Sequence, residues 1–375
     1  MVDLALKTML YDKLRFLITV AGVAFAVALV LVQGGLFLGI LDNATVTIDH
    51  IAADLWVTPR NTPYVDFGHA FPETRVSRVR AVPGVMRADN LIVAFMTVAL
   101  PTGAQEQTLI YALEDFGRWR IPWAVDAGDL RDLRRGPYIV IDASATKRFG
   151  RFSVGDYREV LGHRLKIIGR SREALSFTTT PISFVDFARA QTLSPQELTG
   201  RTTYILVKLA PHADTAAVRA EIRQRMPYND VYTRAEWATR SRDYWIVNTG
   251  IGLSMFMTAF LGALVGVVIV AQTLYSSTME HLKEFGVVKA IGGSNADIYG
   301  ILAKQALIAA LVGFLIGVVP SLALQPVVAR AGLKMIVPPV FVVLALIGTL
   351  VFCLVAALVS FRKVAKIDPA LVFRG

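Results

Sequence analysis

The stretch FLITVAGVAFAVALVLVQGGLFLGIL, residues 16–41, contains no charged side chain and decides the fold class of this chain. At about 1.5 Å per residue, a helix of this length can cross a hydrocarbon core about 30 Å thick. A cleavable leader would have a shorter apolar region of about 7–15 residues, followed by a small-x-small cleavage site. We therefore predict a retained membrane-spanning helix at residues 16–41.

Three further apolar blocks follow, at residues 246–274, 305–325 and 338–361. Hydrophobic residues make up 54% of the 375 residues, and the mean hydropathy is +0.51. This composition is more apolar than that of an ordinary soluble domain. Tyr244 and Trp245 precede the second block, and these residue types favour the headgroup level of a membrane. The chain is predicted to span the membrane four times.

Lysine and arginine in short flanking segments indicate the orientation of the helices, because such residues are enriched on the cytoplasmic side. The basic residues on the predicted cytoplasmic side are Lys7, Lys13, Arg15, Lys283, Lys289, Lys304, Arg362, Lys363, Lys366 and Arg374. Arg330 and Lys334, in the short connection at residues 326–337, are outnumbered. Both termini are thus predicted to be cytoplasmic and residues 42–243 to be extracytoplasmic.

The predicted organisation is an integral membrane α-helical protein, with four transmembrane helices in a 1+3 arrangement and an α+β extracytoplasmic domain between the first and second helices. Its segments are a cytoplasmic N-terminal segment (1–15), transmembrane helix 1 (16–41), the extracytoplasmic domain (42–243), transmembrane helix 2 (246–274), a cytoplasmic coupling loop (275–304), transmembrane helices 3 (305–325) and 4 (338–361), and a cytoplasmic tail (362–375).

The extracytoplasmic segment has the composition of a folded domain. Short β-rich runs predict strands at residues 53–58, 90–99, 107–113, 138–142, 163–168 and 203–209. Apolar residues at helical spacing over residues 216–226 follow Asp214 and Thr215, and predict a helix that begins there. Two groups of strands and helices suggest two subdomains, divided near residue 130.

No catalytic, cofactor-binding or metal-binding constellation stands out. The chain lacks the G-x-x-x-x-G-K-[ST] loop of P-loop ATPases, its five histidines are widely separated, and its one cysteine, Cys353, lies in an apolar block. The formal net charge of +10 is scattered without a basic run interleaved with aromatics, so a nucleic-acid partner is not predicted. Ionisable residues are also absent from the centres of the spans, which disfavours a proton- or ion-coupled transporter. Energy for transport would therefore have to come from another subunit.

Glycines spaced four apart recur in three of the spans. Such pairs let helix backbones approach closely and could serve contacts within the chain or between two copies, although glycine is common in membrane helices. The candidate packing residues are Gly35, Gly39, Gly262, Gly266, Gly313 and Gly317.

The connection STMEHLKEFGVVKAIGGSNADIYGILAKQ predicts one amphipathic helix that ends at Gly292 and Gly293 and a second that begins at Ser294. Asp297, three residues after Ser294, completes a capping-box-like start. Apolar residues recur every third position in the first helix, which suits either a docking surface or a helix lying on the membrane.

This connection resembles that of the FtsX/MacB-like family of ABC transporter permeases, in which it reads roughly E-x-x-K-E-x-G-x-x-[KR]-A-[IL]-G-[AG]-[ST]. The matching residues are Glu280, Lys283, Glu284, Gly286, Lys289, Ala290, Ile291, Gly292, Gly293 and Ser294. His281 departs from the arginine often found there. The tail at residues 366–371 resembles the family's D-P-x-x-A-L-R ending, and residues 53–57, 82–85 and 149–156 resemble its external domain. Residues 21–26 and the short chain are most similar to the DevC-like subgroup.

The resemblance implies a non-catalytic permease subunit in a bacterial inner membrane, acting by mechanotransmission. A separate ABC ATPase, which binds ATP and magnesium, would dock on residues 280–294, with Glu280, Lys283, Glu284, Gly286, Lys289, Ala290, Gly292, Gly293 and Ser294 as ATPase-coupling residues. A permease homodimer, a periplasmic adaptor and an outer-membrane channel are the further partners it implies. The expected function is export of an amphipathic or lipid-like substrate. Two alternatives stay open, namely a transducer that regulates an extracytoplasmic cell-wall hydrolase and a two-component exporter of haem or a hydrophobic toxin.

Overall fold

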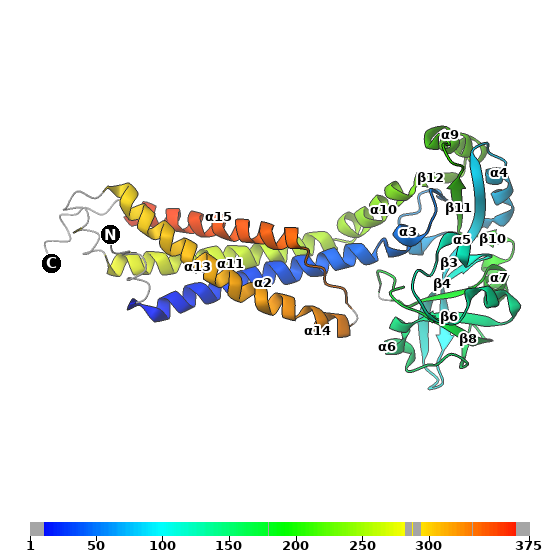
Figure 1. The fold of residues 1–375 in the computed structure, drawn as a ribbon, viewed down its shortest axis with the longest axis horizontal. Coiled ribbons are helices and arrows are strands. Elements are labelled where there is room, and N and C mark those ends of the chain that lie inside the picture. Colours follow the sequence, from blue (N-terminus) through cyan, green and yellow to red (C-terminus); the bar gives the residue numbers. More distant parts are fainter. Residues whose placement is uncertain (1–10, 179, 282–286, 288–293, 332, 365–375) are drawn as a thin grey trace. The chain divides into compact units, whose positions relative to one another are not determined.

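The computed structural model describes residues 11–178, 180–281, 287, 294–331 and 333–364, with side chains up to residue 360. The chain separates into two compact units, with boundaries after Gly39 and after Gly250. We call the unit before the first and after the second boundary the helical unit, and residues 40–250 the sheet unit (Figure 1).

The helical unit is built from long apolar helices. Its elements are α2 (Lys13–Asn43), which runs on into the sheet unit, α11 (Ile251–Glu280), α13 (Asn295–Ala323), α14 (Gln325–Arg330) and α15 (Pro339–Val364). Within the described residues, four helical stretches are long and apolar enough to cross a membrane. The predicted fold class, four transmembrane helices with an α+β domain between the first and second, is confirmed.

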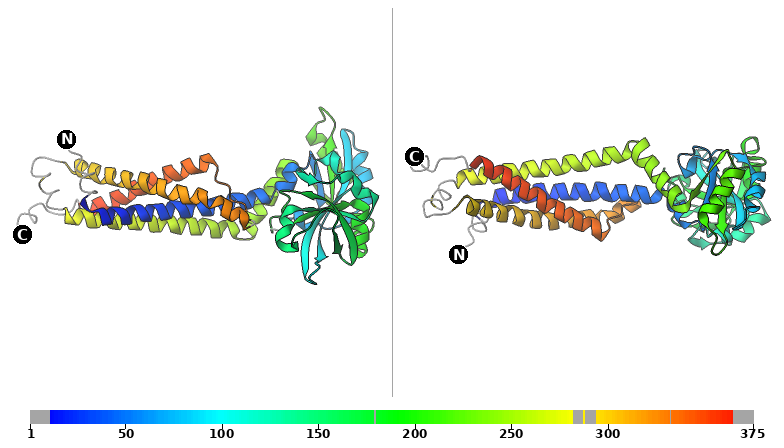
Figure 2. Two further views of the ribbon diagram at one scale, coloured as in Figure 1. Left: turned by 60° about the horizontal axis from the view of Figure 1, so that its bottom comes forward. Right: turned by 90° about the horizontal axis from the view of Figure 1, so that it is seen from above.

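The four long helices run side by side around a common apolar core (Figure 2). Each contributes buried side chains, for example Leu31 from α2, Leu274 from α11, Phe314 from α13 and Cys353 from α15. Helix α15 packs against both α11 and α13. Lipid tails are as apolar as these side chains, so close packing rather than the hydrophobic effect holds such a bundle together.

The helix ends differ from the predicted spans, because backbone hydrogen bonding continues where hydropathy falls. Helix α11 begins at Ile251 instead of residue 246 and continues to Glu280, while α13 begins at Asn295, ten residues before the predicted span. The predicted capping box is confirmed: the Ser294 hydroxyl accepts from the Asp297 amide, and the Asp297 carboxylate accepts from the Ser294 amide. Residues 275–280 and 295–304 of the predicted loop are therefore helical, as the end of α11 and the start of α13. The short helix α14, in the predicted 326–337 connection, was not anticipated.

The sheet unit contains one large mixed sheet and a two-stranded sheet. Its strands are β1 (Leu55–Pro59), β2 (Phe71–Pro72), β3 (Val85–Ala99), β4 (Gln105–Leu113), β5 (Val125–Ala127), β6 (Tyr138–Asp142), β7 (Tyr157–Val160), β8 (His163–Ser171), β9 (Ile182–Asp186), β10 (Arg201–Thr202), β11 (Tyr204–Leu209) and β12 (Asn229–Thr233). All six predicted strands are present. The other six were missed, being short or, as with β9 and β12, lacking a clear alternation of apolar and polar residues.

The large sheet has the order β12-β1-β11-β3-β4-β9-β6-β8-β5. Strand β7 pairs with both β3 and β8, so β3, β4, β9, β6, β8 and β7 form a closed ring. One apolar core is formed mainly by the strands of this ring, and a second lies where β1, β11 and β12 meet helices α4 (Val76–Arg80) and α9 (Thr215–Arg225). The predicted division near residue 130 is wrong, because residue 130 falls inside the ring and the second core joins residues 55–88 to residues 205–231.

Short helices connect these strands. They are α3 (Val46–His50), α4 (Val76–Arg80), α5 (Phe116–Trp119), α6 (Thr146–Phe149), α7 (Phe187–Leu193), α8 (Pro195–Leu198), α9 (Thr215–Arg225) and α10 (Arg234–Asp243), with 3-10 turns at Val65–Phe67, Glu73–Arg75, Leu130–Arg135 and Ala143–Ala145 and a π-helix, η5, at Tyr244–Asn248. The predicted start of α9 is confirmed, since the Asp214 carboxylate accepts a hydrogen bond of 2.9 Å from the Ala216 amide.

Candidate functional site at the ends of α2, α11 and α13

The carboxylate of Glu280, the last residue of α11, is paired with the guanidinium of Arg15, in the first turn of α2. Arg15 also contacts the Asp12 carboxylate at 3.0 Å. The Arg15 side chain is 28% exposed and the Glu280 side chain 57% exposed, so solvent screens the pair. Such a pair contributes little to stability, but it fixes how two helix ends meet. We call this region, where residues 281–294 connect α11 to α13, the loop end.

A polar layer lies one turn deeper into the bundle. The Thr19 hydroxyl on α2 lies 2.8 Å from the Arg15 carbonyl oxygen and 2.9 Å from the Thr273 hydroxyl on α11, and its single proton can be donated to either oxygen. Thr19 and Thr273 line a small cavity of about 30 Å³. Gln305 on α13, which is 4% exposed, lines the same cavity. Sequence reasoning missed this layer, because single polar residues in apolar blocks carry no recognisable spacing.

Two of the predicted coupling residues flank the connection at the loop end. Glu280 ends α11, and Ser294 caps α13. The other seven, namely Lys283, Glu284, Gly286, Lys289, Ala290, Gly292 and Gly293, lie outside the described residues. Arg15 was used only to orient the helices, and its partnership with Glu280 could not be read from positions 265 residues apart.

The six candidate packing glycines all lie against another segment of this chain. A Cβ atom on Gly262 or Gly266 of α11 would lie 3.1 Å from the Leu29 side chain or 2.6 Å from the Ala26 side chain, both on α2. On α13, Gly313 meets Val23 and Gly317 meets Val27 in the same manner.

The third glycine pair lies on α2 itself, near the end of the helical unit away from the loop end. A Cβ on Gly35 would lie 2.8 Å from Val337, and one on Gly39 only 1.9 Å from the Lys334 carbonyl oxygen. Gly22 was not among the predicted packing glycines, but a Cβ atom on it would lie 2.6 Å from the Ile269 side chain on α11. Helix α2 is therefore held by small-residue contacts to both α11 and α13.

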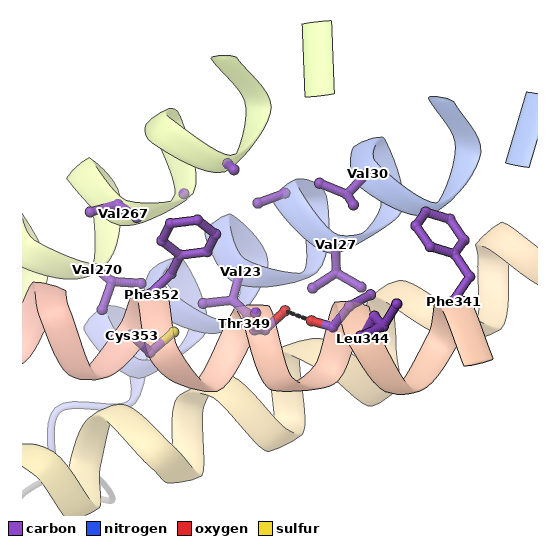
Figure 3. Close-up of a pocket in the computed structure, with 15 residues that line it drawn as sticks. Val23, Val27, Val30, Val267, Val270, Phe341, Leu344, Thr349, Phe352 and Cys353 are labelled. Carbon is purple, nitrogen blue, oxygen red and sulfur yellow. Dashed lines mark hydrogen bonds between the residues drawn. The ribbon is translucent and has the colours of Figure 1, made fainter. Parts of the chain in front are cut away.

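An apolar cavity of about 290 Å³ lies between α2, α11 and α15 (Figure 3). Val23 and Val27 line it from α2, Val270 from α11, and Phe341 and Phe352 from α15. The Thr349 hydroxyl satisfies its own hydrogen bond by donating to the Ala345 carbonyl at 2.7 Å. The cavity therefore presents no free hydroxyl donor from this residue and suits apolar groups.

The sheet unit buries a carboxylate. Asp66 is 4% exposed and accepts a 2.5 Å hydrogen bond from the Ser176 hydroxyl. Burial raises the pKa of Asp66 to about 6, although the hydroxyls of Ser176, Tyr64 and Tyr111 limit that rise. Burial also raises the pKa of Tyr64 and of Tyr111 well above its ordinary value, so both stay protonated.

Aromatic rings collect beside Asp66. Trp245 is 9% exposed, stacks on Phe177 with ring centroids 3.5 Å apart, and meets Tyr64 edge-on at 5.3 Å. Tyr244 lies parallel to Tyr64 at 6.2 Å. Trp245 therefore packs within the sheet unit, and its position at the headgroup level stays a prediction. The sequence pattern cannot distinguish a membrane interface from a domain core, because an aromatic pair before a span suits either environment.

Among the described residues, no group of three or more His, Cys, Asp or Glu side chains is placed to hold a metal ion.

Two family models match this chain. The model described as MacB-like periplasmic core domain matches residues 16–225, and the one described as FtsX-like permease C-terminal matches residues 256–369. The first covers more than half of the chain. Together they extend over most of the sheet unit and most of the four long helices.

Curated relatives match along nearly the whole chain. An uncharacterized ABC transporter permease of Mycobacterium tuberculosis is 28% identical over 99% of both chains. The macrolide export ATP-binding/permease protein MacB of Agrobacterium fabrum is 23% identical over 95% of this chain and 58% of its own length.

Solved structures also resemble part of the chain. The periplasmic region of MacB from Actinobacillus actinomycetemcomitans matches 50% of this chain and 92% of that one, with a TM-score of 0.40 and 9% identity. The extracellular domain of the noncanonic ABC-type transporter YknZ matches 48% of this chain and 99% of that one, with a TM-score of 0.36 and 18% identity.

Proposed function

Because this chain belongs to the FtsX/MacB-like family of ABC transporter permeases, we propose that it transmits ATP-driven motion from a separate ATPase to its sheet unit. The sheet unit, which corresponds to the family's periplasmic core domain, would thereby expel an amphipathic or lipid-like substrate. The arrangement of the loop end carries this proposal. The connection at residues 281–294 is attached directly to α11 and α13, and through Arg15 and Glu280 also to α2.

Force applied to that connection would reach three helices at once. Glu280 joins it to α11 and, by its ion pair, to α2, while the capped residue Ser294 joins it to α13. Close contacts at Gly266 and Gly313 hold α2 against both other helices along their length. Interdigitated helices resist shear because their interiors are close-packed, so they transmit displacement instead of absorbing it.

The proposed partner is an ABC ATPase that binds ATP and magnesium and docks on residues 280–294 from the cytoplasm. In that orientation both termini are cytoplasmic. The chain itself has no phosphate-cradling loop of the P-loop type, so ATP hydrolysis is assigned to the partner. A permease homodimer, a periplasmic adaptor and an outer-membrane channel complete the proposed assembly. The DevC-like subgroup stays a prediction.

Substitution in the connection tests the coupling. Glu284→Lys or Gly286→Trp is expected to leave the protein in the membrane at its normal level while abolishing its ATP-dependent function. Glu197→Lys is the matched charge reversal, because Glu197 is exposed on α8 of the sheet unit. Normal function with either loop substitution would contradict the docking role of these residues.

A deletion strain separates export from transduction. Export predicts that the substrate accumulates in the cell, or that the strain becomes hypersensitive to an amphipathic toxin. A defect in cell separation without accumulation would instead support regulation of a cell-wall hydrolase. Hypersensitivity that does not depend on an outer-membrane channel would favour two-component export of haem or a hydrophobic toxin.

A further inference from the structure

A shallow cleft of about 520 Å³ lies on the sheet unit. It is lined by Asp49 and His50 at the end of α3, Arg120 and Trp123 just after α5, and Arg234 at the start of α10. These residues come from three distant parts of the sequence, so the fold alone brings them together. We call them the cleft residues.

Arg120 is exposed, and no ion pair or side-chain hydrogen bond to another described residue is found for it. The acidic side chain closest to it in sequence, Asp115, is occupied by Arg118 at 2.6 Å. The backbone of Arg120 is left-handed, with φ of 56°. This conformation is uncommon outside glycine, asparagine and aspartate, and is retained only where the surrounding structure enforces it.

Arg234 is the second exposed guanidinium in the cleft, and no side-chain partner is found for it among the described residues. Glu236, two residues along α10, is engaged by Arg219 at 2.7 Å and by the capping box with Thr233. The cleft therefore retains two positive charges that no neighbouring carboxylate neutralises.

One carboxylate does line the cleft, and it is already paired. Asp49 accepts a 2.7 Å hydrogen bond from the Thr45 hydroxyl and lies 3.2 Å from the guanidinium of Arg242. Its negative charge is balanced locally, so the cleft keeps a positive balance. An anion that entered would meet two free guanidinium groups and one compensated carboxylate.

An aromatic wall completes the cleft. The rings of His50 and Trp123 stack with centroids 4.2 Å apart, and His50 is oriented by a 2.7 Å hydrogen bond from its Nδ1 to the Val46 carbonyl. The indole Nε1 of Trp123 is buried and has no acceptor among the described residues. The stacked pair therefore forms an ordered aromatic wall beside the two guanidinium groups.

We propose that the cleft residues bind a phosphate-bearing group. A guanidinium matches phosphate oxygens with paired N–H donors, and a phosphate group offers two guanidinium groups more oxygens than a carboxylate does, and a negative charge that a neutral sugar lacks. The phosphate can come from a lipid headgroup or from a free phosphate in solution. Chain connectivity favours the headgroup. Asn43 is the last residue of the membrane helix α2, and the short segment from Asn43 to His50 can extend no further than about 25 Å.

Intrinsic fluorescence of the full chain in a non-ionic detergent measures this binding. All five tryptophans belong to the sheet unit, and Trp56, Trp119, Trp237 and Trp245 are buried at 0%, 1%, 0% and 9% exposure. Trp123 is partly exposed, so a ligand in the cleft will change chiefly its emission. The titrants are inorganic phosphate, short-chain phosphatidylglycerol below its micellar concentration, and an aspartate-rich peptide.

Substitutions in the cleft identify the site. Arg120→Asn keeps a residue that tolerates the left-handed backbone, and Arg234→Gln keeps side-chain length. Each is expected to weaken binding about tenfold, the loss of one charge-assisted contact. Arg60 is an exposed arginine directly after β1, whereas Asp49 and His50 of the cleft precede that strand. Arg60→Gln is therefore expected to leave the affinity unchanged. An unchanged emission maximum and elution volume for the unliganded variants show that they are folded.

The outcomes decide both the proposal and the source of the phosphate. Saturable binding of phosphatidylglycerol alone supports a lipid headgroup, and saturable binding of inorganic phosphate supports a free phosphate, provided that both cleft variants weaken it and Arg60→Gln does not. Absence of saturation by either titrant overturns the proposal. Equal weakening in all three variants also overturns it, because it indicates a non-specific charge effect. Tighter binding of the acidic peptide would reassign the cleft to a protein partner and overturn the proposal as well.

Discussion

The guanidinium of Arg15 in α2 donates a hydrogen bond to the carboxylate of Glu280, which lies 265 positions later in the chain at the end of α11. The pair joins the first and second membrane helices at the point where the connection to the third begins. This relationship gives the predicted coupling segment a mechanical connection to α2, which sequence spacing alone did not supply.

Reversing the charges of this pair tests that connection. Arg15→Glu and Glu280→Arg are each expected to lower ATP-dependent function severalfold, because like charges then face each other at the helix ends. The double variant restores the attraction and should recover much of the lost function. The measurement is the function of each variant at equal membrane levels. A double variant as impaired as the singles would show that the pairing itself is not required.

Gly317 and Gly300 lie on the same helix, α13, in opposite surroundings. A Cβ on Gly317 would lie 2.6 Å from the Ala24 carbonyl oxygen, whereas nothing lies within 4 Å of one on Gly300. Gly317→Ala is expected to destabilise the bundle by about 1–3 kcal/mol through overpacking. Gly300→Ala should be neutral or slightly stabilising, because alanine favours the helix. The measurement is the melting temperature of each variant in detergent, monitored by size-exclusion chromatography. Equal melting temperatures for the two variants would contradict the packing described for α2 and α13.

Asp66 predicts a pH dependence of the sheet unit's stability. Its pKa is raised from an ordinary 3.8 to about 6 by burial, so between these values the folded state holds a proton that the unfolded state has lost. The free energy of unfolding of the sheet unit should therefore fall as pH rises from about 4 to about 6. Above about pH 6 the total loss is about 3 kcal/mol. Tryptophan fluorescence during denaturant unfolding follows this unit alone, since it contains all five tryptophans.

Asp66→Asn removes one titrating group and should reduce this slope while raising stability at neutral pH by about 1–3 kcal/mol; Asp142, whose pKa burial also raises, keeps a smaller slope of the same sign. Asp132→Asn, at a partly exposed position, serves as the control and should keep the slope. A wild-type slope in Asp66→Asn would mean that other groups cause the dependence.

The sequence identified the spans and most long strands because each has a local signal. An uncharged run such as residues 16–41 excludes most alternatives, and Asp214 and Ser294 mark helix starts through their own hydrogen bonds. The helix ends at Glu280 and Asn295 were misplaced, since a helix continues through polar residues when its backbone stays bonded.

What the sequence could not supply are relationships between distant residues. The ring closed by β7 depends on pairing with both β3 and β8, which no local pattern predicts. For the same reason the polar layer at Thr19 and Thr273 and the partner of Glu280 were missed. The burial of Trp245 against Phe177 was missed as well, because the two residues are far apart in sequence.

The most direct test of the central claim is purification of this chain from native membranes in a mild detergent, with mass spectrometry of the proteins retained. We expect that an ABC-type ATPase copurifies with the wild-type chain and with Glu197→Lys, and is lost with Glu284→Lys. Absence of an ATPase from wild-type samples in which the helical unit is intact, or its full retention by Glu284→Lys, would contradict docking on residues 280–294.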